Sequence, residues 1–223
     1  MQKTKDLFQE ADLKKIFSNK ELLEDYADSL MNTLTNVEQG ILYYLLSKRR
    51  AVTKSTLRSF FINKFYSVVC VQWIKLHPES VQNQREKQIL STPFFPDWHP
   101  ELTISPHLID QVSNEIEKEI ESEMNKKKGI VTETRRLGLV SKAFAKYKIN
   151  LPSINVISSS LKSLKKMGLV NFRIVDSLNP EKQQKAKAKD NEGSYQRELW
   201  FVNPMYEVYL KKIYKEDKEI IEE

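Results

Sequence analysis

Scarcity of glycine is the feature that most limits what this chain can fold into. The 223-residue sequence contains only five glycines. Sheet-rich folds need many tight turns, and tight turns use Gly because it adopts positive φ at little cost. We therefore expect a mainly helical chain. The five positions also form no Gly-rich phosphate loop of the Walker or dinucleotide type; they are Gly40, Gly129, Gly138, Gly168 and Gly193.

The composition is that of a folded protein. Hydrophobic residues supply 40% of the chain and charged residues 30%, which is enough apolar material for a core. A single cysteine, Cys70, excludes an internal disulfide and a four-Cys zinc site. The sequence has no long apolar run and no signal-peptide pattern. We therefore expect an intracellular protein, cytoplasmic or in the nucleoid or nucleus, with no membrane partner.

Charge is distributed unevenly along the chain. Residues 126–197 hold 17 Lys or Arg against 5 Asp or Glu, whereas the remainder holds 19 basic against 25 acidic residues. Such asymmetry suggests two parts with different partners. Lysines that merely solvate helix faces would give the same count, so the basic block indicates nucleic acid only if a suitable fold underlies it.

Residues 1–90 are expected to form a helical N-terminal domain. Apolar spacing and capping residues predict four helices, over 3–17, 19–33, from Thr35 or Asn36 to Lys48, and from Thr53 or Ser55 to Leu76. The dipeptide His77-Pro78 ends the last of them. This region is rich in aromatic residues, which form either its core or a surface for dimerisation or a protein partner.

Residues 91–105 are expected to form an ordered connecting loop, because three prolines among several aromatics exclude a helix or a central strand. The acidic and histidine side chains around this loop match no metal-site spacing; they are Asp97, His99, Glu101 and His107. The glutamates from Glu115 to Glu123 are interpreted as a solvated helix face. We expect no catalytic residue, no metal and no cofactor, and hence not an enzyme.

From residue 106 onward the pattern changes from helices to a mixture. Helices are predicted over 106–124, 132–147 and 153–167, strands over 169–175 and 197–202, and a last helix from Pro204. The first of these helices has an apolar stripe every four residues, formed by Leu108, Val112, Ile116, Ile120 and Met124. A polar stretch with four lysines separates the two strands.

This order resembles the winged helix-turn-helix superfamily over residues 106–223. The stretch Leu161–Val170 looks like the end of a recognition helix that runs through Gly168 into the first strand of a wing. The expected fold class is mainly α with a small β-hairpin, a winged-helix domain preceded by an all-helical domain. Residues 34–65 are similar to the first two helices of another winged helix, although no recognition helix or wing follows, so a second copy stays open.

The resemblance implies a regulator of transcription that binds double-stranded DNA. Helical periodicity turns Ile157, Leu161 and Leu164 inward and the polar side chains of the same helix outward, where Asn and Ser suit base edges and Lys suits phosphates. Lysines of the wing would reach flanking phosphates. The candidate DNA contacts are Arg135, Arg136, Asn155, Ser158, Ser159, Lys162, Lys166, Arg173, Lys182, Lys185, Lys187, Lys189 and Arg197.

Two other interpretations remain. Winged helices also serve as docking subunits in replication, segregation or transcription assemblies, and a Ser-rich helix start can mean capping alone. Because one winged helix makes few contacts with DNA, we also expect a homodimer. Residues 106–223 are expected to carry the DNA affinity, and residues 1–100 to lack it.

Overall fold

The computed structural model describes most of the chain, and its regular elements are α-helices and two β-strands. The described residues are 19–48, 50–78, 100, 104–126, 131–176, 196–204, 207 and 210. Their elements are α2 (Lys20–Thr33), α3 (Asn36–Lys48), α4 (Lys54–Leu76), α6 (Pro106–Lys126), α7 (Glu133–Lys146), α8 (Ile154–Lys166), β1 (Val170–Asp176) and β2 (Gln196–Val202). The expectation of a mainly α protein with a small β-hairpin is confirmed at this level.

Side-chain caps fix where the helices begin. Thr35 and Glu38 form a reciprocal capping box: Thr35 N–H donates to Glu38 Oε2 at 2.9 Å, and Glu38 N–H donates to Thr35 Oγ1 at 3.3 Å. Thr53 Oγ1 accepts from Thr56 N–H at 3.1 Å, and Thr132 Oγ1 accepts from Arg135 N–H at 3.4 Å. Each of these helices therefore begins where the sequence predicts it.

The described residues pack as two compact units. Unit 1 consists of the described residues within 1–57 and 154–223, and unit 2 consists of those within 58–153. Helix α4 begins in unit 1 and continues in unit 2, because its first four residues precede the boundary at Leu57.

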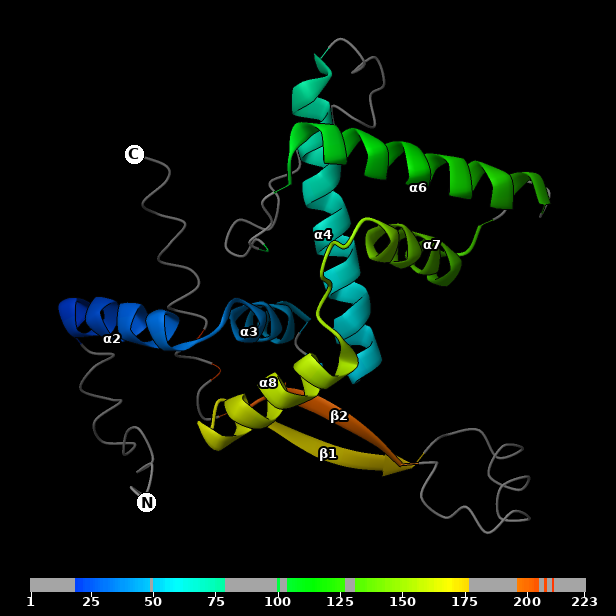
Figure 1. The fold of residues 1–223 in the computed structure, drawn as a ribbon. Helices are drawn as coiled ribbons and strands as arrows, with labels where there is room; N and C mark the ends of the chain where they lie inside the picture. The colour runs from blue at the N-terminus through cyan, green and yellow to red at the C-terminus, as the bar shows by residue number, and fades with distance from the viewer. Residues whose placement is uncertain are drawn as a thin grey trace, which may run out of the picture. The chain divides into compact units, whose positions relative to one another are not determined.

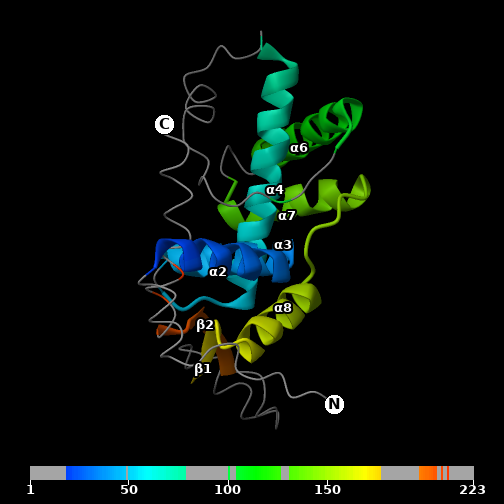
Figure 2. The same cartoon turned by 90° about the vertical axis from the view of Figure 1, so that its left-hand side faces the viewer.

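Unit 1 is built around a two-stranded antiparallel hairpin. Strand β1 pairs with β2 in a register that runs from Val170 opposite Val202 to Asp176 opposite Gln196. Helix α8 lies along the hairpin in both views (Figures 1 and 2), and α3 contacts α8 and β2. Val52 adds a short antiparallel bridge to β2 at Trp200.

This division groups the chain differently from the consecutive domains expected from sequence, 1–90, 91–105 and 106–223. The physical reason is the pairing of Val52 with Trp200 and the packing of α3 on α8, which join residues before the boundary to residues far beyond it. Helices α6 and α7 belong to unit 2, whereas α8 and the hairpin belong to unit 1.

Unit 2 contains α6 packed on α7. The buried residues of α6 include Ile109, Val112 and Ile116, and those of α7 include Leu137, Leu139, Val140, Ala143 and Phe144. The predicted apolar stripe of α6 is wrong at its end: Met124 is exposed and Glu123 is 7% exposed. A carboxylate takes this inner position because a guanidinium of α7 lies opposite it, as described below.

Several predictions fall outside the described residues. They are the helix over 3–17, most of the connecting segment 91–105, the wing lysines Lys182, Lys185, Lys187 and Lys189, and most of the last helix after Pro204.

Gly138 provides a test of the helical backbone geometry of α7. It lies on the exposed side of α7, and a Cβ added there would meet nothing within 4 Å. We expect Gly138→Ala to raise the free energy of unfolding by about 0.5–1 kcal/mol, because Gly costs that much in a helix interior. Urea denaturation measures the change.

Gly168 is the matched control, because it has φ of 78°. Gly168→Ala should lower the free energy of unfolding by about 1–2 kcal/mol, since a side chain is strained in the left-handed region. A destabilising Gly138→Ala would contradict the helical geometry at this position.

Candidate nucleic-acid interface

Helix α8 has a buried apolar stripe on one side and an exposed polar face on the other. Ile157, Leu161 and Leu164 are each 0% exposed, as the sequence predicts. The opposite face carries candidate contacts whose side chains are all exposed: Asn155, Ser159, Lys162 and Lys166. Ser158 lies at the edge and is half-buried. The buried stripe fixes the rotation of the helix, so the polar face points to solvent.

The hairpin adds two exposed cations to unit 1. Arg173 on β1 and Arg197 on β2 are both exposed, and each lies on the face of the sheet opposite the Phe172 and Trp200 side chains, because side chains alternate along a strand. No ion pair between described residues includes Arg173, Arg197, Lys162 or Lys166.

Trp200 is the centre of a cluster that links four segments of unit 1. Its ring lies 4.8 Å from that of Phe172 on β1, and its Nε1–H donates to Glu198 Oε2 at 3.2 Å. Lys54, the first residue of α4, pairs with the same Glu198 oxygen at 2.6 Å and stands 5.9 Å from the Trp200 ring centre. Lys165 Nζ of α8 lies 4.2 Å from the Phe172 ring centre.

The electrostatic consequence of this cluster appears at Glu198. The hydrogen bond from Lys54 lowers the pKa of its carboxyl below the usual range, and the positive charges of Lys54 and Lys162 add to the effect, whereas partial burial opposes it. The carboxylate is therefore held ionised between cations.

Arg135 and Arg136 lie in unit 2, and each forms an ion pair with a carboxylate of that unit. Arg135 donates from Nε and Nη2 to the two oxygens of buried Glu123, at 3.1 and 3.0 Å. Arg136 pairs with Glu133 at 2.8 Å and donates to Asn63 Oδ1 at 3.1 Å. The structure does not bring these two arginines together with the α8 side chains in one unit.

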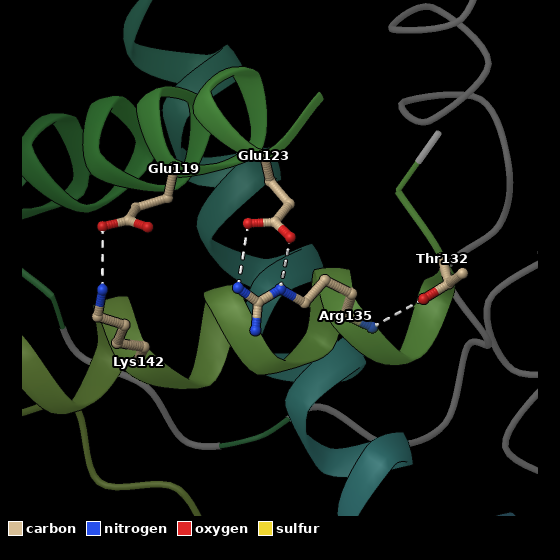
Figure 3. A network of polar contacts seen from close by, with 5 residues as sticks. All are labelled: Glu119, Glu123, Thr132, Arg135 and Lys142. Atoms are coloured by element: carbon tan, nitrogen blue, oxygen red, sulfur yellow. Dashed lines mark hydrogen bonds and ion pairs between the residues drawn. The ribbon is translucent and has the colours of Figure 1, made fainter. Parts of the chain in front are cut away.

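Three ion pairs join α6 to α7. Figure 3 shows Glu119 and Glu123 of α6 facing Lys142 and Arg135 of α7, and Lys142 Nζ is 3.1 Å from Glu119. Further along, Lys146 pairs with Glu115 at 2.7 Å, which lowers the pKa of Glu115 and raises that of Lys146. The glutamates interpreted as a solvated face are thus in part a contact surface.

Sequence reasoning missed the residues that hold the hairpin in place, namely Lys54, Lys165, Glu198 and Trp200. The predicted strand over 197–202 contains Glu198 and Trp200, and the predicted cap at Thr53 directly precedes Lys54. The local pattern of neither segment, however, indicates that the two segments are in contact. Of the thirteen predicted DNA contacts, two lie in unit 2, four lie outside the described residues, and seven are described residues of unit 1: Asn155, Ser158, Ser159, Lys162, Lys166, Arg173 and Arg197.

A cavity of about 460 Å³ borders the hairpin beside Arg173. Arg50 and Glu207 supply its other charged lining groups, and the remaining described lining residues are apolar. Among these residues we find no Ser, Cys or His that could act as a nucleophile with a neighbouring base. We therefore assemble no catalytic site in this cavity.

The described part of the chain holds no group of three or more His, Cys, Asp or Glu side chains arranged to bind a metal ion. No described helix combines the length and the apolar character needed to cross a bilayer. The predicted homodimer and localisation stay predictions.

Comparison with known proteins adds no further constraint. The chain matches no protein family, no curated protein and no solved structure.

The lowered pKa of Glu198 leads to a testable prediction about the pH dependence of stability. Because its pKa is lower in the folded than in the unfolded chain, the ionised carboxylate stabilises the fold above the ordinary Glu pKa of about 4.3, and this contribution is lost as pH falls through the lowered value. We expect Glu198→Gln to unfold more readily than the wild type at pH 7, by about 1 kcal/mol or less, since both partners are partly exposed.

The difference between the two proteins should begin to shrink below about pH 4. It should disappear once the pH lies below the lowered pKa of Glu198, where both proteins carry a neutral side chain at this position. Urea denaturation at pH 7 and pH 3 gives the two differences, and the other carboxylates cancel because both proteins contain them. A difference that is the same at both pH values would show that the charge of Glu198 does not stabilise the hairpin.

Proposed function

We propose that this protein binds double-stranded DNA through α8 and the β1–β2 hairpin, as a sequence-preferring regulator. The observation that carries the proposal is the exposed polar face of α8 above a fully buried stripe. Such a helix fits the major groove, where amide and hydroxyl groups can meet base edges while ammonium groups meet phosphates.

The charges of this surface support the same partner. Residues 154–175 contain Lys162, Lys165, Lys166 and Arg173, and no Asp or Glu. Helix α6, by contrast, carries six acidic side chains along Pro106–Lys126, of which three pair with α7. Glu198 on β2 carries a negative charge beside these cations, and it pairs with Lys54. A surface with an excess of positive charge attracts a polyanion, whereas a surface whose cations are paired with carboxylates attracts it less.

The order of elements in unit 1 supports a winged helix made from two separate pieces of the chain. In that interpretation α3 is the first helix, Val52 stands for the first strand, the start of α4 is the second helix, α8 is the recognition helix and β1–β2 is the wing. The antiparallel bridge between Val52 and Trp200 on β2 fits this arrangement. Residues 58–153 would then be an insertion between the second and third helices.

This interpretation moves the winged helix away from α6 and α7. The similarity of residues 34–65 to the first two helices of a winged helix then belongs to the same module as Leu161–Val170, and no second module is needed. Arg135 and Arg136 leave the proposed DNA surface, because each is paired within unit 2.

The lysines of α8 test the role of this surface. We expect the double change Lys162→Gln with Lys166→Gln to weaken binding to all duplexes and to reduce the slope of log affinity against log salt by about 2, since each phosphate contact contributes about 0.9. Fluorescence anisotropy on a random duplex at several salt concentrations measures both quantities.

The matched control is Lys118→Gln with Lys126→Gln, which removes the same charge from exposed positions of α6. It should leave the slope unchanged. If the wild type shows no salt-dependent affinity for duplex DNA, the role of this winged helix would instead be docking to a protein.

The two-piece arrangement also changes what a fragment should do. Residues 106–223 lack α3, Val52 and the start of α4, all of which belong to unit 1. We therefore expect this fragment to lose the packing on α8 and to bind duplex DNA at least tenfold more weakly than the whole chain, a loss of about 1.4 kcal/mol. Full affinity in the fragment would contradict the two-piece winged helix.

A further inference from the structure

One apolar side chain stands out on the otherwise polar surface of α8. Val156, in the first turn of the helix, is 43% exposed. Its neighbours on this surface are Asn155 and Ser159, which are both exposed. Ser159 Oγ donates to the Val156 carbonyl oxygen at 2.8 Å, so the two residues lie one above the other on one side of the helix.

The surroundings of Val156 limit what can cover it. A single β-branched side chain among amide, hydroxyl and ammonium groups is too small an apolar area for a protein-docking surface. The cations Lys162 and Lys166 further along α8, with no acidic residue in the helix, complement a polyanion. An apolar group that a polyanionic duplex offers in its major groove is the 5-methyl group of thymine.

Asn155 supplies the complementary chemistry on the same turn. A carboxamide can bind adenine through N6 and N7 with two hydrogen bonds, and the thymine of the same or an adjacent pair places its methyl group nearby in the groove. The N-terminal part of a recognition helix is the part that meets base edges, and Asn155 and Val156 are the second and third residues of α8.

We propose that Asn155 and Val156 together select A·T base pairs, with Val156 packing against a thymine methyl group. This inference rests on the proposed function, and it names the sequence class that the site recognises. The selectivity follows from the loss of apolar surface from water, which only thymine offers at that position of the groove.

The size of the effect follows from one methyl group. Removing a buried methyl or methylene from an apolar contact costs about 0.8 kcal/mol, which corresponds to an affinity change of about fourfold. Replacing thymine by uracil removes only this methyl group and leaves the base pair and its hydrogen-bonding groups in place.

The experiment uses the full chain and duplexes that it selects from a randomised pool. Each selected duplex is made twice, once with thymine and once with uracil at the same positions, and the two dissociation constants are compared. For the wild type we expect the uracil duplex to bind about fourfold more weakly. For Val156→Ala we expect the two duplexes to bind with nearly equal affinity.

Ile174→Ala is the control, because Ile174 on β1 is the other exposed large apolar side chain among the described residues of α8, β1 and β2, at 57%. It should keep the wild-type preference for thymine. Circular dichroism checks that both variants fold, and both changes are at exposed positions, where substitutions have little effect on stability.

The outcomes separate this inference from the proposed function. Equal binding of thymine and uracil duplexes by the wild type, with salt-dependent affinity intact, would overturn the role of Val156 and leave DNA binding in place. A thymine preference that survives Val156→Ala, or that is lost in Ile174→Ala, would also overturn it. No salt-dependent binding to any duplex would overturn both.

Discussion

The interaction on which unit 1 depends is the pairing of Trp200 with Val52. Val52 N–H donates to the Trp200 carbonyl at 2.9 Å, and Trp200 N–H donates to the Val52 carbonyl at 2.8 Å. Trp200 is 2% exposed, and its ring contacts Phe172. Two backbone hydrogen bonds and one buried aromatic ring thus connect a segment near residue 50 to a strand near residue 200. Together with the packing of α8 on β1 and of α3 on β2, they support a two-stranded sheet that would be marginally stable on its own.

This connection explains how a long intervening segment can be accommodated. The entropy cost of closing a loop grows only with the logarithm of its length, by about 0.6 kcal/mol for each doubling. Unit 2 also buries apolar side chains of its own, such as Ile116 and Phe144. A compact unit can therefore lie between α3 and α8 in the sequence while those two helices remain packed together.

Sequence predicted the elements better than it predicted their partners. The caps at Thr35, Thr53 and Thr132 and the inward stripe of α8 follow from local rules, because each depends on residues within one or two turns. The bridge from Val52 to Trp200 depends on residues far apart in the chain, and periodicity does not report which apolar face meets which. Glu123 was predicted to be solvated for the same reason. The burial of a carboxylate can be predicted only when its partner is known, and the partner Arg135 lies on another helix.

Charge counts along the sequence mislead in the same way. The basic block over 126–197 includes Arg135, Lys142 and Lys146, yet in the structure these cations pair with glutamates of α6. Within the described part of the chain, no ion pair joins a cation of α8 or of the hairpin to a neighbouring helix. A stretch of sequence with high positive charge is therefore not equivalent to a positive surface, because folding can bring acidic side chains of a neighbouring helix to part of it. Among the described cations of the basic block, Arg135, Lys142 and Lys146 are paired with α6, and the α8 lysines and the hairpin arginines are those that the proposed DNA surface uses.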